Sequence, residues 1–267
     1  MSKTKMKRRE LVAESYGGGR VFIAGDAAHV MSPTGGFGMN TGIGDAVDLS
    51  WKLEALLAGW GGPLLSESYT IERRPVAERN VRESSANLRR MLSPGENPAL
   101  CDDTPEGEAT RARVGTAFAE AMRHEWYTLG IHLGYRYDDS PIVVPDGTPA
   151  PPLENARYVP NARPGARAPH AVLGDAHSTL DLFGREFVLL GLTGGADDSV
   201  PAAFDAAARE RGMPLRTVAL NEPEVRELYG APYVLVRPDG HVAWRGDAVS
   251  DAAAVVDRVR GGSGPET

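Results

Sequence analysis

Cysteine is nearly absent from this chain, in which Cys101 is the only one among 267 residues. A single cysteine excludes an internal disulfide, a CxxC redox pair and a zinc site built from cysteines, and it is typical of a reducing compartment. No segment approaches the ~18 apolar residues of a membrane-spanning helix. No apolar segment follows the basic N-terminal stretch "MSKTKMKRRE" either, as it would in a secretory signal. These absences predict a cytoplasmic protein.

An excess of positive charge is also missing. The formal net charge is −7, so binding to nucleic acid or to an anionic membrane surface has no electrostatic support. The six histidines show no HExxH or other metal-binding spacing, and the GxSxG motif of serine hydrolases does not occur. We therefore expect no metal site and no serine hydrolase.

Hydrophobic periodicity predicts one strand and then helices in the first half of the chain. The strand covers Arg20–Gly25, and helices follow over 39–58, from Ser66 to about residue 91, and over 105–129. Gly59 stands where the first helix should end, and Pro75 marks a kink in the second helix or a junction of two helices. Residues 140–169 are rich in proline and have no sustained period, which indicates an extended connector.

The last hundred residues alternate differently. Their pattern is strand, helix, strand, helix, then two strands joined at Asp239–Gly240 and a final helix. This βαβαββα order is typical of a thioredoxin-like sheet with helices on both faces. Ala231–Pro232, just before a strand, is where that fold commonly places a cis proline. The expected fold class is therefore α/β.

The segment "FIAGDAAHVMSPTGGFGMNTGIGDA", which begins at Phe22, carries the strongest functional signal. It places Asp26 at the end of a strand and four glycines before or inside the start of a helix: Gly35, Gly36, Gly38 and Gly42. Glycines allow backbone N–H groups to approach a ligand closely, and a helix N-terminus favours electron-rich groups. The Asp26 carboxylate would accept a hydrogen bond from a polyol. These features suit a cofactor with a polyol chain and a ring that can hold negative charge.

This segment closely resembles the second FAD-contacting motif of the class A flavin-dependent aromatic hydroxylases. The resemblance continues through "YTIERRPVAERN" and "LGIHLGYRYDDSPIVVPDGTPAP" and into the region opened by "RPGARAPH". It points to the branch that contains phenol hydroxylase and the polyketide hydroxylases of aromatic antibiotic pathways. It implies three parts: residues 1–139 as the C-terminal part of an FAD-binding monooxygenase domain, 140–169 as a connector and 170–262 as a thioredoxin-like domain without CxxC.

The family assigns roles to individual residues of the motif. Gly25 and Asp26 resemble the pair whose aspartate hydrogen-bonds the ribityl chain of FAD, and Pro33 resembles the proline beside the flavin ring where oxygen reacts. The residues that resemble the loop and first helical turn facing the flavin are Gly35, Gly36, Gly38, Met39 and Asn40. The resemblance further implies that NAD(P)H reduces the FAD and that oxygen is transferred to a phenolic or polyketide aromatic ring.

Other polar residues have simpler interpretations. His29 is expected to be structural rather than a base, and the acidic pairs Asp102–Asp103 and Asp138–Asp139 to be solvated turns. Tyr135, Arg136 and Tyr137 lie where this family approaches its interdomain region, and a structural role is favoured over direct substrate contact.

The family's N-terminal dinucleotide-binding unit with GxGxxG has no counterpart in this sequence. A βαβ unit needs ~30 residues, and only about 20 precede the first expected strand. The chain therefore resembles the C-terminal half of a hydroxylase, and we expect it to bind FAD weakly or not at all by itself. Three hypotheses follow. It is a fragment or truncated product, or it is one chain of a split enzyme completed by a partner or by another copy. Alternatively, it is a non-catalytic interaction protein built on the thioredoxin-like domain.

Overall fold

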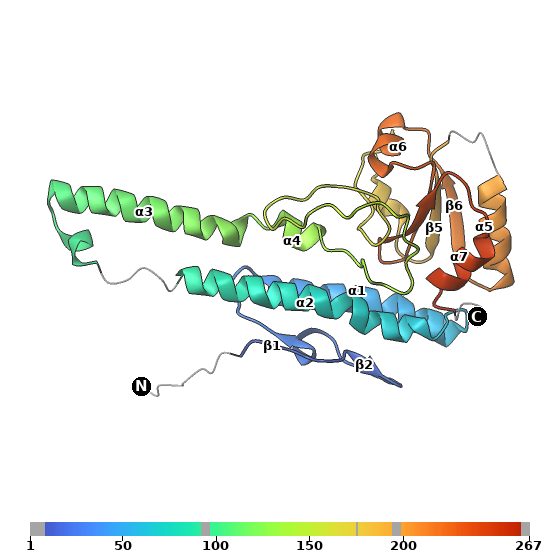
Figure 1. The fold of residues 1–267 in the computed structure, drawn as a ribbon, viewed down its shortest axis with the longest axis horizontal. Coiled ribbons are helices and arrows are strands. Elements are labelled where there is room, and N and C mark those ends of the chain that lie inside the picture. Colours follow the sequence, from blue (N-terminus) through green and yellow to red (C-terminus); the bar gives the residue numbers. More distant parts are fainter. Residues whose placement is uncertain (1–8, 92–96, 175, 194–198, 263–267) are drawn as a thin grey trace.

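A long helical hairpin lies beneath the C-terminal sheet in the view of Figure 1. The structure is a computed structural model that describes residues 9–91, 97–174, 176–193 and 199–262; most of the basic N-terminal stretch, residues 1–8, lies outside them. Helices α1 (Phe37–Ala58) and α2 (Leu64–Met91) lie side by side. As predicted, α1 ends at Gly59, whose φ of +83° is the left-handed conformation that glycine adopts most readily.

Helix α2 runs through Pro75 without interruption. The alternative of two separate helices is therefore wrong. A proline inside a helix removes one backbone hydrogen bond, but α2 is held along its length by α1 and by side chains buried between the two helices.

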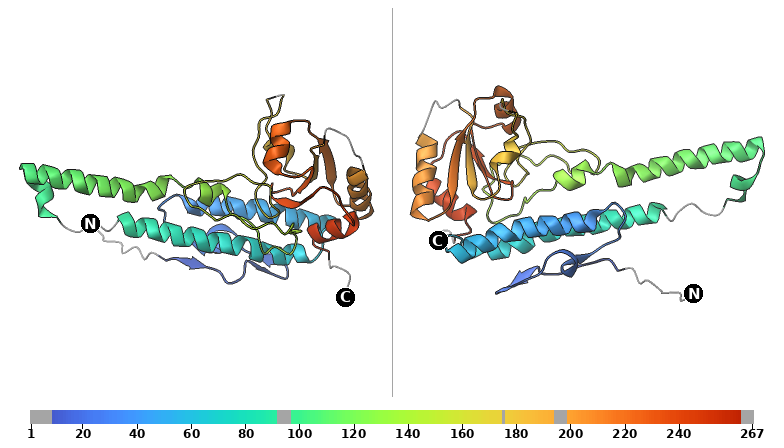
Figure 2. Two further views of the ribbon diagram at one scale, coloured as in Figure 1. Left: turned by 45° about the horizontal axis from the view of Figure 1, so that its top comes forward. Right: turned by 180° about the vertical axis from the view of Figure 1, so that it is seen from behind.

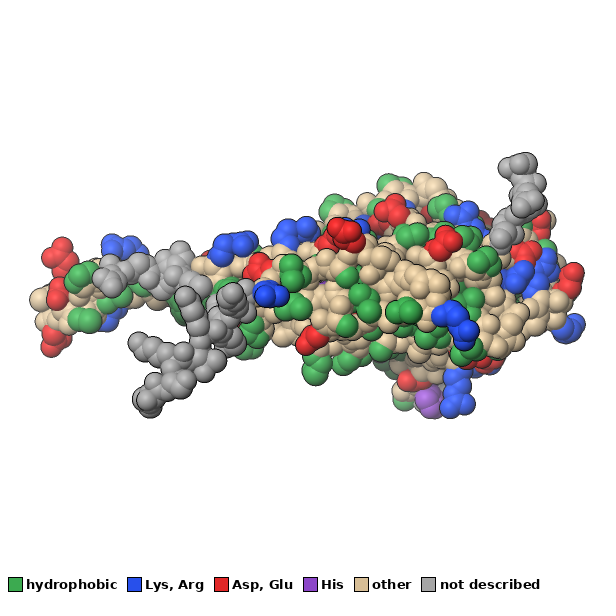
Figure 3. Space-filling model, turned by 90° about the horizontal axis from the view of Figure 1, so that it is seen from below, with side chains coloured by type: hydrophobic (Ala, Val, Ile, Leu, Met, Phe, Trp, Pro, Cys, Tyr) green, Lys and Arg blue, Asp and Glu red, His purple; other side chains and the backbone are tan. Residues whose placement is uncertain are grey.

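Two small hairpins precede the helices. Strand β1 (Leu11–Val12) pairs with β4 (His29–Val30), and β2 (Gly17–Gly18) pairs with β3 (Val21–Phe22). The prediction of a buried strand over Arg20–Gly25 was wrong, because only two of its residues form a strand and Val21 is 70% exposed. This strand has one short partner and no larger sheet to bury it. Figure 3 views the molecule from the side of these hairpins and shows apolar side chains scattered along that face.

A 3₁₀ helix and two α-helices connect the helical hairpin to the rest of the chain. The 3₁₀ helix η2 (Pro98–Cys101) leads into α3 (Pro105–Trp126), which Thr104 caps by accepting a hydrogen bond from the Gly107 N–H. Helix α4 (Leu129–Leu133) follows after a turn, so the helix expected over 105–129 ends earlier than predicted. Both views of Figure 2 show α3 extending away from the C-terminal sheet.

The C-terminal part is a four-stranded sheet in the order β6–β5–β7–β8. Its strands are β5 (Phe187–Gly191), β6 (Leu215–Ala219), β7 (Tyr233–Val236) and β8 (Val242–Gly246), and its helices are α5 (Ser199–Glu210), α6 (Pro223–Tyr229) and α7 (Ala252–Val259). Strands β5 and β6 are parallel, and β7 is antiparallel to both β5 and β8. This arrangement is compatible with the thioredoxin-like fold expected from the sequence.

The bond before Pro232, where the thioredoxin-like fold commonly has a cis proline, is trans, since the described residues contain no cis peptide. Instead the Pro232 carbonyl accepts a hydrogen bond of 2.7 Å from the Leu192 N–H, which extends the pairing of β5 with β7. None of the described helices is both long enough and apolar enough to cross a membrane.

One apolar cluster joins the helical hairpin to the sheet. Trp51 of α1 and Trp60 after it pack edge-on against Phe187 of β5, with ring centroids 5.7 and 6.2 Å apart. Leu65 and Ile142 belong to the same buried cluster as the sheet residues. The closed end of the hairpin and the sheet therefore share one core.

Candidate functional site

The turn that carries Asp26 is the 3₁₀ helix η1 (Gly25–Ala27), and it packs against α1. Gly25 has a φ of +59°, which favours glycine, and a Cβ added at Gly42 of α1 would lie 3.2 Å from its Cα. Glycine at both positions therefore allows the turn to lie against the second turn of the helix. The Asp26 side chain is exposed, and no hydrogen bond or ion pair from any other described residue reaches its carboxylate.

Asp45 fixes this turn from the inside. Its fully buried carboxylate accepts hydrogen bonds from the Gly25 N–H at 3.1 Å, His29 Nε2 at 2.7 Å and Arg73 Nε at 2.9 Å. Burial tends to raise the pKa of Asp45, but the hydrogen bond from His29 and the charge of Arg73 outweigh it and lower that pKa. His29 is buried and bound to Asp45, which agrees with the structural role predicted for it.

The glycine loop leads directly into α1. The Gly36 N–H donates to the Pro33 carbonyl at 3.1 Å, and Gly35 and Gly36 have φ of +83° and +66°. The Gly35 N–H donates to Glu125 Oε1 of α3 at 3.0 Å, which ties the loop to that helix. Among the described residues no side chain caps the N-terminus of α1, so its first N–H groups stay available to a ligand.

The predicted residues of the first helical turn face outward. Met39 is 74% exposed, Asn40 and Pro33 are also exposed, and the Asn40 amide folds back to donate to the Gly36 carbonyl at 2.9 Å. The structure therefore brings the Asp26 turn and the glycine loop to the same end of α1. An unpartnered carboxylate beside uncapped helix amides fits a ligand with hydroxyl donors and an electron-rich ring.

A second charged cluster, not predicted from the sequence, lies deeper on the same helix. Lys52 Nζ contacts Asp48 Oδ2 at 2.7 Å and Glu72 Oε2 at 2.6 Å. Arg237, which follows β7, contacts Glu72 Oε1 at 2.6 Å, Asp48 Oδ1 at 3.0 Å and Asp239 Oδ2 at 2.6 Å. We call these five residues the Arg237 cluster. It connects both helices of the hairpin to the C-terminal sheet.

Burial and neighbouring charges act in opposite directions on the carboxylates of the Arg237 cluster. Burial raises the pKa of Asp48 well above its usual range. At Glu72 and Asp239 burial acts in the same direction, but the charge of Arg237 outweighs it and the pKa of each is lowered. The three carboxylates are close enough to share a metal ion, but Lys52 and Arg237 already occupy their oxygens.

Helical spacing was the signal that could have found both clusters. Thr41, Asp45, Asp48 and Lys52 recur at the three- and four-residue intervals of one helix face, and all four are buried. Charges on the core-facing side of a helix require partners. Their main partners, Glu72 and Arg73, lie in the stretch "YTIERRPVAERN".

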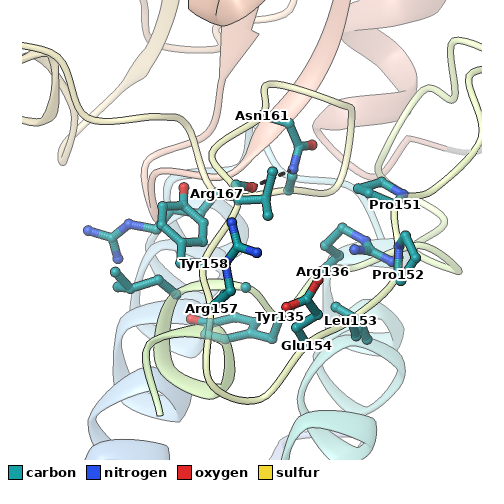
Figure 4. A pocket seen from close by; sticks show the side chains of 14 residues that line it. Tyr135, Arg136, Pro151, Pro152, Leu153, Glu154, Arg157, Tyr158, Asn161 and Arg167 are labelled. Atoms are coloured by element: carbon teal, nitrogen blue, oxygen red, sulfur yellow. Dashed lines mark hydrogen bonds between the residues drawn. The ribbon is translucent and has the colours of Figure 1, made fainter. Parts of the chain in front are cut away.

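Tyr135, Arg136 and Tyr137 follow α4 and lie between the hairpin and the connector. Tyr137 is buried, and its hydroxyl accepts a hydrogen bond of 3.1 Å from Arg73 Nη1. Figure 4 shows Tyr135 and Arg136 at the edge of a hollow whose other labelled side chains come from residues 151–167. The hollow measures about 20 Å³, which is room for about one water molecule and not for a cofactor.

Two family models match the chain. The FAD binding domain matches residues 1–84, and the aromatic-ring hydroxylase C-terminal family matches residues 161–262. Both matching regions are similar to FAD-dependent aromatic hydroxylases. The resemblance inferred from the glycine motif is thereby confirmed at the level of the family.

Individual relatives agree with this assignment. The FAD-dependent monooxygenase apdD of Emericella nidulans is 38% identical over 250 residues, covering 89% of this chain and 40% of that protein. A solved structure of RebC with bound 7-carboxy-K252c matches with a TM-score of 0.87 and 48% identity, over 94% of this chain and 48% of RebC. A ternary complex of aklavinone-11 hydroxylase with FAD and aklavinone matches with a TM-score of 0.71 and 36% identity, over 94% and 45% of the two chains.

The chain spans a little under half the length of the curated relatives that it matches. The matching part runs from the FAD binding domain model into the C-terminal hydroxylase model. The α/β fold, with helices followed by a sheet, is the fold of the same part of RebC and of aklavinone-11 hydroxylase.

Proposed function

We propose that this chain supplies the ribityl-contacting and flavin-facing part of the FAD site in a monooxygenase that hydroxylates a phenolic or polyketide aromatic compound. The observation that carries the proposal is the exposed, unpartnered Asp26 carboxylate, held beside the uncapped N-terminus of α1 by the buried Asp45. The names of the relatives, which are monooxygenases and hydroxylases, support the reaction class.

Each residue has a defined role in this proposal. Asp26 accepts hydrogen bonds from ribityl hydroxyls, and Gly25 allows the turn that presents it. Pro33 lies beside the flavin ring. The loop and first helical turn that face the ring are formed by Gly35, Gly36, Gly38, Met39 and Asn40. The Gly35 and Gly36 N–H groups already donate to Glu125 and Pro33, so the uncapped N–H groups of the helix itself stabilise negative charge on the ring through the helix dipole. Bound FAD would accept reducing equivalents from NAD(P)H and activate oxygen for transfer to the substrate.

The proposal also covers the contacts to the adenine and pyrophosphate part of FAD. The relatives are about twice as long as this chain, so we propose that residues from the part of their length that it does not span complete the adenine and pyrophosphate site. Another chain or a second copy could supply such residues. We keep the predicted division into 1–139, 140–169 and 170–262 and the cytoplasmic location as parts of the proposal, the latter because of the single cysteine.

Flavin titration of the purified chain tests the proposal. Riboflavin contains the ribityl chain and the ring but no adenine or pyrophosphate, so it should bind about as well as FAD. Asp26→Ala should weaken riboflavin binding about tenfold, as expected for a lost hydrogen bond to a charged group. Asp103→Ala, which removes another exposed carboxylate, is the matched control.

The readout is quenching of flavin fluorescence, followed by the absorbance spectrum after desalting. Unchanged riboflavin affinity in Asp26→Ala would refute the role of that carboxylate. Equal loss of affinity in Asp103→Ala would show that net charge, rather than the turn, determines binding.

A further inference from the structure

Helix α3 is exposed along most of its length. Of its 22 residues only Gly107 and Thr110 are buried, and both views of Figure 2 show it extending away from the C-terminal sheet. A helix of 22 residues is about 33 Å long. Helix α3 therefore presents a long surface that the described part of the chain leaves uncovered.

One side of α3 does pack against the rest of the chain. Arg111 Nη1 donates a hydrogen bond to the Asp102 carbonyl at 2.8 Å, and Glu125 Oε1 accepts the hydrogen bond from the Gly35 N–H. The buried Thr110 lies on this side too. These contacts attach α3 to the segment after η2 and to the glycine loop, so this side is occupied.

Another side of α3 carries a regular row of exposed residues. We call it the outer face, and it consists of Glu108, Ala112, Gly115, Ala119, Met122 and Trp126. The residues follow one another at alternating intervals of four and three, which is the spacing that keeps one helix face along a partner helix. All of them are exposed except Met122, which is half-buried. Within the described residues, this face has no packing partner.

Trp126 is the most unusual residue of the outer face. Its side chain is 77% exposed, whereas the other three tryptophans of the chain are at most 7% exposed. Tyr127 and Leu129, which follow it, are 56% and 60% exposed. Large apolar side chains that are exposed together are typical of a surface that contacts another protein.

The sizes of the side chains suit a second copy of α3 in antiparallel orientation. The first half of the outer face has small apolar side chains such as Ala112, and the second half has the large side chains of Met122 and Trp126. In an antiparallel pair centred on Ala117, the midpoint of the row, Met122 of each copy lies against Ala112 of the other. Trp126 then reaches the first turns of the second copy. Large side chains pack against small ones, as interlocking helices require.

The charges at the two ends of α3 select the same orientation. The first turn carries Glu106 and Glu108, and both are exposed. The last turn carries Arg123 and His124, which are exposed as well. Antiparallel contact places the acidic turn of each copy beside the basic turn of the other. Parallel contact would instead place Glu108 against Glu108, and like charges across an interface are unfavourable.

Arg123 is available for such a contact. Within the chain it lies 3.4 Å from Glu120 Oε2 and 5.1 Å from the centre of the Tyr127 ring. The side chains of Arg123 and Glu120 are 60% and 71% exposed, and an exposed pair of this kind contributes little to stability. Arg123 can therefore turn toward Glu108 of a second copy at little cost to α3.

We propose that the outer face of α3 is a dimer interface and that it binds the outer face of a second copy of this chain in antiparallel orientation. Trp126 of each copy is buried against the first turns of the other, and the charged turns pair at both ends. The two-fold symmetry of this contact closes the assembly at two copies. The inference concerns α3 and does not depend on the proposed flavin site.

Sedimentation equilibrium of the full chain over a range of concentrations measures its self-association. The expected species has twice the mass of one chain. Trp126 reports on the interface, because the other three tryptophans are already buried in one copy. The tryptophan emission should therefore move to shorter wavelength as the dimer forms, and this shift should be absent in Trp126→Phe.

Truncation of Trp126 tests its contribution to the contact. Trp126→Ala should weaken the dimer about tenfold or more, because an aromatic side chain buried at the interface is lost. Leu57→Ala, which removes an 87% exposed side chain of α1, is the matched control and should leave the dimer unchanged.

Charge reversal tests the pairing of the two ends. The double variant Glu106→Lys with Glu108→Lys makes both ends of α3 positive, and Arg123→Glu with His124→Glu makes both ends negative. Each double variant alone should weaken the dimer about tenfold or more, because like charges then meet at both ends. An equimolar mixture of the two should form a heterodimer, since opposite charges meet again.

Glu224→Lys with Glu227→Lys makes the same change in net charge at exposed sites of α6 and should leave the dimer unchanged. Circular dichroism verifies that each variant keeps its helix content.

Four results would overturn the proposal. The first is a chain that stays monomeric up to about 100 µM, which would leave the outer face to a different protein. The second is a dimer whose formation leaves the Trp126 emission unchanged, which would place the contact elsewhere. The third is equal weakening by the α6 control, and the fourth is a mixture of the two charge variants that stays monomeric. None of them bears on Asp26, so riboflavin titration distinguishes failure of this inference from failure of the proposed function.

Discussion

The two buried charge clusters on α1 differ in what they connect. The Asp45 cluster is local: its carboxylate holds the Gly25 turn, His29 and Arg73, all in the first part of the chain. The Arg237 cluster is long-range, since Arg237 lies 165 residues after Glu72 in the sequence and contacts it directly. Asp45 and Asp48 nevertheless lie one helical turn apart on the same face.

This difference separates two tasks. The Asp45 cluster orients the turn that presents Asp26, whereas the Arg237 cluster attaches the C-terminal sheet to the helical hairpin. Damage to the first should therefore alter flavin binding as well as stability. Damage to the second should mainly lower stability, because it leaves charges buried without partners.

The largest expected effect is that of Arg237→Met. Removing the guanidinium leaves the carboxylates of Glu72, Asp48 and Asp239 without one of their cations, and breaking a buried pair costs about 3–5 kcal/mol. Urea denaturation measures the free energy of unfolding. Arg209→Met, at an exposed site of α5, should change it little. A loss no larger than that of the control would contradict the structural role of the cluster.

Asp45→Asn should have a smaller effect on stability, about 1.5–3 kcal/mol at pH 7, with Asp103→Asn as its control. Because the pKa of Asp45 is lowered in the folded state, its contribution is present above the unfolded pKa of about 3.9 and is lost as the pH falls through the folded value. The stability difference between wild type and variant should therefore shrink below about pH 4.

Riboflavin affinity should also distinguish Asp45→Asn from Arg237→Met. It should fall in Asp45→Asn, because the Gly25 turn loses its anchor, and it should hold in folded Arg237→Met. The reverse order would contradict the division of tasks between the two clusters.

The smallest expected effect is the difference in unfolding free energy between alanine substitutions at two glycines, Gly42 and Gly115. A Cβ at Gly42 would press on Gly25, which Asp45 holds in place, whereas a Cβ at Gly115 of α3 would meet no atom within 4 Å. Gly115→Ala should stabilise the protein by up to about 1 kcal/mol through helix propensity. Gly42→Ala should be less stable than Gly115→Ala by about 1–2 kcal/mol. Equal free energies of unfolding for the two variants would show that the Gly25 turn moves to accommodate the added Cβ without a measurable cost.

Much of the fold could be predicted because its signals are local. The end of α1 at Gly59 and the alternation of strands and helices after residue 185 depend on neighbouring residues. The strand over Arg20–Gly25 was predicted wrongly for the same reason. Its apolar sequence reads as buried, but burial needs partner strands, and β2 alone does not provide them.

The sequence by itself determined the similarity to the aromatic hydroxylases and the position of the glycine motif. A Gly-Asp pair and closely spaced glycines before a helix are set by backbone conformation, which a short segment encodes. Only the tertiary structure decided that Asp45 anchors this turn, that Arg237 joins the sheet to the hairpin, and that the outer face of α3 stays exposed. A buried charge or imidazole acquires its role from groups distant in sequence, and these come together only when the chain folds.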